Sequence, residues 1–313
     1  MYDIIIIGGG PAGLTAATNT AHRGLSSLVI EKQDEAGGLP NLLYPDKIIR
    51  DHPGFPVGIL GKELSRMLVM QAKNAGSAFM FDEEALYIRR KGEALVEVET
   101  TQATYEGKRA IVCTGIYNVP KKLDVLHNYS GSNVHHKIEN PRTFKDKRVI
   151  IVGGGDHAFD TAVQLSPLAE NVTVLVKRGY AKAKEYTVNL AESAGVQVLY
   201  NTEIIRILPG RSGEFERVQV VNDETEEKRV LGADDLFIAI GFKPVRRFLQ
   251  TNGFQMKEDG SVIVDRTLQT NIPGVFAAGD VTGEIRLIAT SCAEGIVAAV
   301  HAFEEIKQPY WLR

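Results

Sequence analysis

The stretch "DIIIIGGGPAGLTA", Asp3 to Ala16, places the pattern Gly-x-Gly-x-x-Gly between an apolar strand and a helix-like segment. In such a unit the first glycine permits a tight turn, the second lets the backbone approach a pyrophosphate, and the third lets helix and strand pack closely. The amino terminus of the helix then attracts negative charge. The pattern predicts a dinucleotide-binding loop, with candidate contacts at Gly8, Gly10, Pro11, Ala12 and Gly13.

A carboxylate follows this loop at the distance that the fingerprint requires. The second apolar strand, Ser27 to Ile30, ends in Glu31, 18 residues beyond Gly13, and Lys32 comes next. A carboxylate in this position can accept hydrogen bonds from both ribose hydroxyls. Strand, glycine turn, helix and acidic residue agree, so the sequence favours a nucleotide site over an ordinary turn in a sheet.

The same turn recurs 145 positions later in "RVIIVGGGDHAFD", Arg148 to Asp160. Here a strand over Arg148 to Val152 is followed by a helix-like segment over Asp156 to Leu168. Alanine is an accepted residue at the third position of the pattern. The second loop contributes the candidate contacts Gly153, Gly155, Asp156, His157 and Ala158. Two loops predict two nucleotides in one chain.

The residues that follow the second loop in the sequence differ from those that follow the first. The offset of 145 that relates the loops moves Glu31 onto Val176, which is followed by Lys177, Arg178 and, further on, Lys182. A 2′-phosphate is repelled by a carboxylate and pairs with guanidinium or ammonium groups, so this segment predicts NADP rather than NAD. The alternative is that these charges belong to a solvated strand end.

Composition bounds the remaining possibilities. The 313 residues are 44% hydrophobic and 24% charged, which is typical of a soluble globular protein with two domains of ordinary size. The net charge of -3 argues against nucleic-acid binding, and no apolar run approaches the ~20 residues of a membrane helix. Asp3 stands only two positions after Met1 and leaves no room for a signal peptide, so we expect a cytoplasmic protein. Cys113 and Cys292 form neither a zinc pattern nor a C-x-x-C pair, and no metal site is expected.

Three further apolar strands end in glycine: "RAIVCTG" in Thr114-Gly115, "LFIAIG" in Gly241, and "TNIPGVFAAGD" in Gly279-Asp280. Together with the first loop they resemble the two-dinucleotide flavoproteins over essentially the whole chain. The resemblance implies that the first loop holds the FAD pyrophosphate and that Asp280 meets the ribityl and phosphate region of the flavin.

The order of these units resembles the small, thioredoxin-reductase-like group of these flavoproteins. The resemblance implies an α/β fold with two Rossmann-like (βαβ) dinucleotide-binding domains, in which the NADP domain is inserted in a discontinuous FAD domain. The expected boundaries are 1–117 for the first part of the FAD domain, 118–241 for the NADP domain, and 242–313 for the second part of the FAD domain. Members of this group form homodimers, and we expect one here.

Thioredoxin reductases of this group carry an active C-x-x-C shortly before the second loop. In this chain the two cysteine positions fall on His136 and Glu139 of "NVHHKIENPRTFKDKRV". Without a dithiol there is no thiolate exchange with a disulfide, so the usual thioredoxin route is excluded unless Cys113 or Cys292 substitutes, and both are interpreted as buried small hydrophobic residues. His135 and His136 are interpreted as part of a polar loop, with a proton-donating role as the alternative.

The segment "AGGLPNLLYPDKIIRDHPGFP", Ala36 to Pro56, is similar instead to the ferredoxin or flavodoxin NADP reductases of the thioredoxin-reductase-like type. That resemblance implies that Tyr44 stacks on the flavin ring, and no acid or base residue is assigned; the alternative is that Tyr44 is a core aromatic residue. Further flavin contacts implied by resemblance are Gly38, Leu39, Asp51, Thr114, Gly115, Gly279, Ile288 and Ala289. The last two begin a helix expected from Glu284 to Ile306.

These features predict an NADPH-dependent FAD oxidoreductase that passes electrons through the flavin to a small acidic carrier, ferredoxin or flavodoxin. A basic docking face for such a carrier has the candidates Lys121, Lys122, Lys243, Arg246 and Arg247. Alternatives are an oxidoreductase for another acceptor (quinone, oxygen or an external disulfide, as an atypical thioredoxin reductase-like enzyme) and a flavin-binding redox sensor without turnover. The end "KQPYWLR" either covers the flavin with Tyr310 or Trp311 or packs on the surface.

Overall fold

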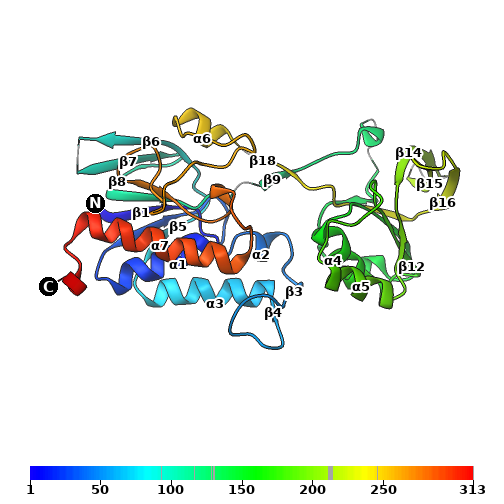
Figure 1. The fold of residues 1–313 in the computed structure, drawn as a ribbon, viewed down its shortest axis with the longest axis horizontal. Helices are drawn as coiled ribbons and strands as arrows, with labels where there is room; N and C mark the ends of the chain where they lie inside the picture. The colour runs from blue at the N-terminus through cyan, green and yellow to red at the C-terminus, as the bar shows by residue number, and fades with distance from the viewer. Residues whose placement is uncertain are drawn as a thin grey trace. The chain divides into compact units, whose positions relative to one another are not determined.

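The computed structural model describes residues 1–92, 94–115, 117–127, 129, 131–210, 214–244 and 246–312. The chain divides into two compact units, Met1–Ile116 with Pro244–Arg313 as the first and Tyr117–Lys243 as the second (Figure 1). The first unit is discontinuous in sequence and the second is inserted in it. Two short strands, β9 (Tyr117–Pro120) and β18 (Phe242–Pro244), pair with each other where the chain enters and leaves the second unit.

The first unit is built on one mixed sheet with the order β5-β2-β1-β8-β7-β6, in which β19 also pairs with β8. Its parallel strands are β1 (Tyr2–Ile7), β2 (Ser27–Ile30), β5 (Ala78–Met80), β8 (Thr104–Val112) and β19 (Val275–Ala277), and its antiparallel strands are β6 (Ala85–Lys91) and β7 (Leu95–Thr100). Parallel strands covered on both faces are continuously apolar, which explains the run Ile4 to Ile7.

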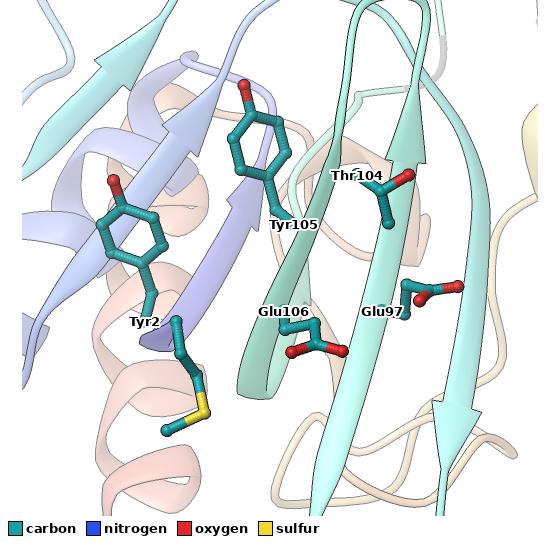
Figure 2. A pocket seen from close by; sticks show the side chains of 6 residues that line it. Tyr2, Glu97, Thr104, Tyr105 and Glu106 are labelled. Atoms are coloured by element: carbon teal, nitrogen blue, oxygen red, sulfur yellow. The ribbon is translucent and has the colours of Figure 1, made fainter.

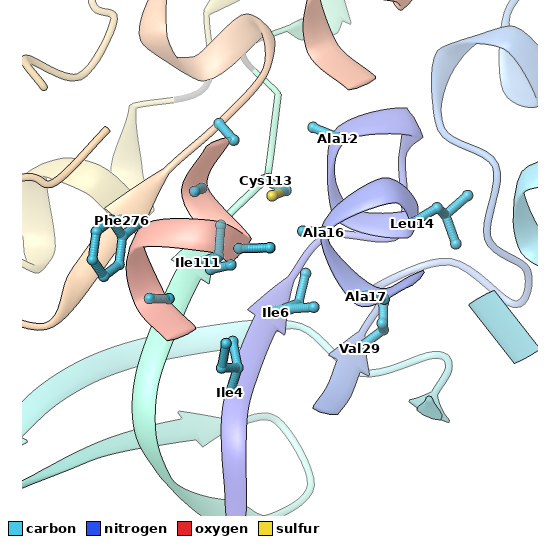
Figure 3. Packing of buried hydrophobic residues seen from close by; sticks show 14 of the residues in the cluster. Ile4, Ile6, Ala12, Leu14, Ala16, Ala17, Val29, Ile111, Cys113 and Phe276 are labelled. Carbon is cyan, nitrogen blue, oxygen red and sulfur yellow. The ribbon is translucent and has the colours of Figure 1, made fainter. Parts of the chain in front are cut away.

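Helices α1 (Pro11–His22), α3 (Gly61–Asn74) and α7 (Ile288–Ile306) pack with this sheet. Figure 3 shows Ile6 of β1 close to Ala16 and Ala17 of α1, and Phe276 of β19 beside α7. Helices α1 and α7 touch so closely that a side chain at Gly295 would overlap with the carbonyl oxygen of Ala12. The shorter elements of this unit are α2 (Leu39–Leu42), β3 (Ile48–Ile49), β4 (Ile59–Leu60), α6 (Arg247–Thr251), η3 (Asp280–Thr282) and η4 (Tyr310–Leu312).

The second unit has a parallel sheet with the order β10-β17-β11-β12-β13 and a separate antiparallel sheet with the order β14-β15-β16. The parallel strands are β10 (Val134–His135), β17 (Asp235–Ile238), β11 (Arg148–Val152), β12 (Asn171–Leu175) and β13 (Gln197–Leu199), and the antiparallel ones are β14 (Thr202–Pro209), β15 (Phe215–Asn222) and β16 (Lys228–Gly232). Its helices are η1 (Asp124–Leu126), η2 (Pro141–Phe144), α4 (Asp156–Leu165) and α5 (Glu185–Ser193).

The predicted α/β fold class with two Rossmann-like units is confirmed, and the differences lie at element ends. Helix α4 ends at Leu165 rather than Leu168, because Pro167 has no amide hydrogen with which to continue the helical hydrogen bonds. Helix α7 begins at Ile288, four residues later than expected. Across the described residues, no helix combines the length and apolar character that a bilayer crossing requires.

Candidate functional site

The first glycine loop leaves no room for side chains at two of its positions. Gly8 follows β1 with a φ of +106°, and a Cβ atom there would overlap with the carbonyl oxygen of Cys113 on the neighbouring strand segment. A Cβ atom at Gly13 would overlap with the carbonyl oxygen of Gly8. At Gly10, by contrast, the nearest atom to an added Cβ is the Cα atom of Gly38, 3.7 Å away. The loop is closed against the sheet and open in front of α1.

Glu31 reaches from the end of β2 to this loop. Its Oε2 atom accepts a hydrogen bond of 2.7 Å from the amide of Gly9, and its Oε1 atom accepts one of 3.0 Å from Gln33. The residue is buried, with 8% of its surface exposed. Each carboxylate oxygen has more than one lone pair, so Glu31 keeps acceptor capacity toward a ribose. Lys32 is exposed beside it.

The segment that carries Gly38 and Leu39 is joined to the same loop. The amide of Gly37 donates to the carbonyl oxygen of Gly9 at 2.8 Å. Gly38 has a φ of +66°, and an added Cβ would lie 2.8 Å from the Cα atom of Gly10. Leu39 then begins α2. The structure therefore brings the loop, Glu31, Gly38 and Leu39 together.

The turn Gly279-Asp280 lies against the first turn of α1. It follows β19, and a Cβ atom at Gly279 would lie 2.9 Å from the Cβ atom of Ala12. The Asp280 carboxylate accepts a hydrogen bond of 3.3 Å from Ser291 of α7. Burial raises the pKa of Asp280, while this hydrogen bond acts in the opposite direction. Asp280 thus stands at the edge where β1, β8 and β19 end, and its contact with a nucleotide stays a prediction.

Glu294, which sequence reasoning missed, holds this turn from α7. Its Oε2 atom accepts hydrogen bonds from the amide of Gly279 at 2.8 Å and from the hydroxyl of Thr282 at 3.0 Å. Burial raises the pKa of Glu294, these two hydrogen bonds oppose that effect, and the charges of Glu284 and Asp280 add to it. A single acidic residue in the otherwise small and apolar run "ATSCAEGIVAAV" was the available signal.

The raised pKa of Glu294 predicts a pH-dependent stability difference between the wild type and Glu294→Gln. A carboxyl whose folded-state pKa lies above its ordinary value of 4.5 stabilises the fold below that value, and this contribution is lost as the pH rises through the raised pKa. Glutamine keeps an acceptor oxygen for Gly279 and Thr282 but does not titrate. We expect the free energy of unfolding of the variant, relative to the wild type, to increase between pH 4.5 and pH 8 in denaturant titrations. An unchanged difference across this interval would contradict the assignment.

Tyr44 lies in the chain between α2 and β3, half-buried in a small apolar cluster. The members of this cluster are Ile49, Ile59 and Leu64, with Tyr44, Phe55, Leu68 and Ile288 packed against them. The Lys47 Nζ atom is 5.4 Å from the centre of the Tyr44 ring. Tyr44 and Ile288, at the start of α7, thus pack against the same apolar cluster, whereas Asp51 lies exposed in the following loop. Stacking of Tyr44 on a flavin stays a prediction.

Other predicted flavin contacts lie at the same edge of the sheet. Thr114 and Gly115 directly follow β8 and its buried neighbour Cys113, and the Thr114 hydroxyl donates to the Gly115 carbonyl at 3.2 Å. Ala289 is in the first turn of α7, where the hydroxyl of Thr290 accepts a hydrogen bond of 3.1 Å from the amide of Leu287. Carboxyl ends of parallel strands are where dinucleotides bind in such sheets.

The second glycine loop repeats the arrangement of the first. An added Cβ at Gly153 would overlap with the carbonyl oxygen of Ala239 on the adjacent strand segment. At Gly154 it would lie 2.9 Å from Val176, just as at Gly9 it would lie 3.1 Å from Glu31. At Gly155 the described residues place no atom within 4 Å. Val176 therefore occupies the place that Glu31 occupies in the first unit.

The chain that follows β12 folds back onto this loop. The amides of Lys182 and Ala183 donate to the carbonyl oxygen of Gly154 at 2.6 and 3.0 Å, and the amide of Lys184 donates to the Asp156 carboxylate at 2.8 Å. His157 lies behind Asp156 with its ring edge on Phe237, at 5.5 Å between ring centres. Ala158 is buried and Gly241 is exposed. Lys182 is thereby fixed close to the glycine loop.

The two predicted 2′-phosphate ligands are exposed and have different partners. Lys177 forms an ion pair of 2.5 Å with Glu203 of β14. Arg178 donates to the hydroxyl of Tyr180 at 2.9 Å, and its guanidinium lies 5.8 Å from the centre of that ring. Glu203, which is 26 residues away from Lys177, had no signal in the sequence.

His135 lies in strand β10 rather than in a polar loop. Its Nε2 atom is 2.6 Å from the buried carboxylate of Asp235, which also pairs with Lys147 at 2.8 Å. Burial lowers the pKa of neighbouring His136, and the charge of Lys122 adds to this effect. The His135–Asp235 contact joins residues 100 positions apart, so the sequence showed no partner.

The C-terminal aromatic residues pack on their own chain. Tyr310 and Trp311 lie 6.4 and 5.9 Å from Phe303, between ring centres, at the end of α7. Ile288 begins this helix 15 residues earlier, which corresponds to roughly 22 Å. Both aromatic residues thus lie at the end of α7 that is distant from Ile288, and the role of this end stays a prediction.

A cavity of about 280 Å³ lies at the amino-terminal end of β1, away from the glycine loop at its carboxyl end (Figure 2). It is lined by Met1, Tyr2, Glu97, Thr104, Tyr105 and Glu106. The Glu97 carboxylate is already paired with Lys91, and the hydrogen bond between them lowers the pKa of Glu97. The cavity is therefore separate from the glycine loop.

Comparison with known proteins gives the family. The model of the pyridine nucleotide-disulphide oxidoreductases matches residues 2–295. The chain belongs to this family. A ferredoxin–NADP reductase of Sulfurisphaera tokodaii is 33% identical over 306 residues, which are 95% of this chain and 91% of that protein. Ferredoxin–NADP reductase 2 of Shouchella clausii is 35% identical over 312 residues, or 96% and 92% of the two chains. The crystal structure of T. acidophilum thioredoxin reductase is similar with a TM-score of 0.88 at 28% identity, covering 97% of this chain and 98% of that one.

The glycine loops fit the cofactors of this family. A glycine directly precedes each of the helices α1 and α4, and no side chain of the described residues caps either helix. The open positions at Gly10 and Gly155 leave space in front of both helices for a pyrophosphate. This pyridine nucleotide-disulphide oxidoreductase is an FAD-dependent NADPH oxidoreductase, and the predicted cofactors FAD and NADPH are confirmed. The C-x-x-C pair is absent from its sequence.

Proposed function

We propose that this oxidoreductase passes electrons from NADPH through FAD to a small protein carrier, ferredoxin or flavodoxin, without an active-site disulfide. The proposal rests on one combination of observations. The chain is similar over nearly its full length to proteins named ferredoxin–NADP reductase, and its sequence contains no C-x-x-C dithiol. Family members that reduce disulfides need a thiolate relay. In this chain the electrons have to leave the flavin directly.

We assign FAD to the first unit. The uncapped amino terminus of α1 binds the pyrophosphate, Glu31 accepts hydrogen bonds from the ribose, and Asp280 is directed by Ser291 toward the ribityl chain. Tyr44 covers one face of the flavin ring, and the first turn of α7 directs its amides at the pyrimidine part. Bound FAD supplies the conversion of two-electron transfer from NADPH into single-electron transfer to a carrier.

We assign NADPH to the second unit. The amino terminus of α4 binds the pyrophosphate, and Lys177, Arg178 and Lys182 bind the 2′-phosphate. Asp156 and His157 shape this loop: Asp156 accepts the amide of Lys184, and His157 packs on Phe237. The protein's part in the reaction is to hold and orient the two cofactors.

The carrier is expected to meet a basic surface, because complementary charge speeds encounter with an acidic protein. Lys121 and Lys122 of the second unit are exposed, and so is Arg247 of the first unit. Arg246 is half-buried and donates to the Glu258 carbonyl at 3.3 Å, while the side chain of Lys243 lies outside the described residues. We also propose a homodimer, on the resemblance to the thioredoxin-reductase-like group, to be tested by light scattering.

The deciding experiment compares acceptors for the FAD-loaded enzyme reduced by NADPH. Stopped-flow reoxidation by ferredoxin, flavodoxin, a quinone, oxygen and thioredoxin gives the rate for each. We expect ferredoxin or flavodoxin to be fastest. A faster quinone, oxygen or thioredoxin reaction would replace the proposed acceptor. If NADPH fails to bleach the flavin absorbance without oxygen, the chain is a flavin-binding sensor instead.

If no thiol relays electrons, an enzyme without cysteine residues should still reduce its electron acceptor. Cys113 is buried, and burial raises the pKa of its thiol, so it is not a thiolate at neutral pH. Cys292 is half-buried, and burial raises the pKa of its thiol as well. The double variant Cys113→Ala/Cys292→Ala is expected to transfer electrons to the acceptor at a rate within about twofold of that of the wild type. A loss of acceptor reduction with normal reduction of the flavin by NADPH would show that a thiol takes part.

A further inference from the structure

The carboxylate of Glu203 forms an ion pair with Lys177, one of the cations assigned to the 2′-phosphate. Its Oε2 atom lies 2.5 Å from the Nζ atom of Lys177, and the two side chains are 37% and 72% exposed. Glu203 is the second residue of β14, in the antiparallel sheet that follows the parallel strands of the second unit. A nucleotide phosphate that approaches Lys177 therefore meets a carboxylate already bound there.

Arg178 is held in a different way. Its described partner is the neutral Tyr180, which accepts a hydrogen bond of 2.9 Å and presents its ring at 5.8 Å. This contact orients the guanidinium without neutralising it. Of the two neighbouring cations, Arg178 keeps its charge for a ligand and Lys177 shares its charge with Glu203.

Further acidic residues stand at the same corner of the second unit. Asn201 receives an amide hydrogen bond from Asp223 at 2.7 Å, and its side chain donates to Glu224 at 2.7 Å. Its own amide donates to the carbonyl oxygen of Arg178 at 3.1 Å. The start of β14 and the end of β15 thus bring negative charge to the end of β12, where Glu203 pairs with Lys177 and the charge of Asp223 also raises the pKa of that lysine.

We propose that Glu203 is a specificity-determining residue that competes with the 2′-phosphate for Lys177 and lowers the preference of the enzyme for NADPH over NADH. The proposal rests on the assignment of NADPH to the second unit. A 2′-phosphate has to displace the carboxylate before it pairs with Lys177, whereas the 2′-hydroxyl of NADH leaves the ion pair intact. Specificity is the difference between the affinities for two ligands. A residue that weakens the affinity for only one of the two ligands therefore changes the specificity.

The test measures the binding of NADP⁺ and NAD⁺ to the full-length, FAD-loaded protein by isothermal titration calorimetry. Because the ion pair is exposed, Glu203→Gln is expected to tighten NADP⁺ binding by about two- to fivefold and to leave NAD⁺ binding unchanged. Glu227→Gln is the matched control. Glu227 lies between β15 and β16 in an exposed ion pair with Arg229, so its replacement removes the same charge away from Lys177.

Four outcomes would overturn the proposal: no effect of Glu203→Gln on NADP⁺ binding, an equal change for NADP⁺ and NAD⁺, the same effect in the Glu227→Gln control, or an effect of Glu203→Gln that persists when Lys177 is already alanine. A different result would overturn the underlying site assignment. If Lys177→Ala/Arg178→Ala leaves NADP⁺ binding unchanged, the nucleotide does not bind at these cations at all. If that variant weakens NADP⁺ binding and Glu203→Gln has no effect, only the role of Glu203 is refuted.

Discussion

Gly13→Ala is expected to yield protein that retains little FAD, with an affinity about ten- to a hundredfold below that of the wild type. The added Cβ atom would overlap with the carbonyl oxygen of Gly8, which is the residue that turns the chain from β1 toward α1. The helix has to move away from the strand, and this movement opens the loop that faces the pyrophosphate. The ratio of flavin to protein absorbance, followed by titration of the flavin-free protein with FAD, measures the effect.

The matched control for Gly13→Ala is Gly92→Asn. Gly92 lies in the same unit with a φ of +66° and has no described atom within 4 Å of an added Cβ, and asparagine tolerates this backbone conformation. Circular dichroism of both variants separates a local defect from a loss of fold. If folded Gly13→Ala binds FAD as tightly as the wild type, the first loop is not the flavin site.

The double variant Lys177→Ala/Arg178→Ala is expected to raise the KM for NADPH by about ten- to a hundredfold and to change the KM for NADH by less than about threefold. Hydrogen bonds to charged groups contribute about 1.5–3 kcal/mol, and NADH lacks the phosphate that would receive them. Steady-state rates with ferricyanide as the acceptor give both constants on the same preparation.

The control for this double variant removes two cations elsewhere in the same unit. Lys228→Ala/Arg229→Ala changes the net charge equally, and both residues are exposed on β16. We expect the ratio of the two KM values to stay at the wild-type level in this control. An equal rise of both KM values in Lys177→Ala/Arg178→Ala would show that the cations do not recognise the 2′-phosphate.

Much of the fold was predictable because its decisive signals are local in sequence. The Gly8 and Gly153 turns each combine a strand, a turn and a helix within about 15 residues, and the steric overlaps at Gly13 and Gly153 explain why glycine is needed. The exchange of Glu31 for Val176 was visible through the constant spacing of the two loops. Each of these two residues lies against the middle glycine residue of its loop, at Gly9 and Gly154.

The parts that were missed depend on contacts between distant segments. Glu203 meets Lys177 only because β14 starts beside the end of β12, and Asp235 meets His135 only because β17 pairs with β10. Glu294 was visible as an acidic residue in an apolar helix, yet its partner at Gly279 follows from the close packing of α7 on α1. Sequence spacing cannot supply such pairs, since strand order and helix crossings decide them.

The pairing of β9 with β18 has a practical consequence for protein engineering. Because the inserted unit enters and leaves through adjacent strands, its two ends are neighbours, which is the arrangement that tolerates domain insertion and exchange. Residues 117–243 can therefore be treated as a cassette. If the inserted unit binds the nicotinamide nucleotide as proposed, grafting the corresponding cassette of an NADH-specific relative onto the remaining chain would change the electron donor and leave the rest of the sequence untouched.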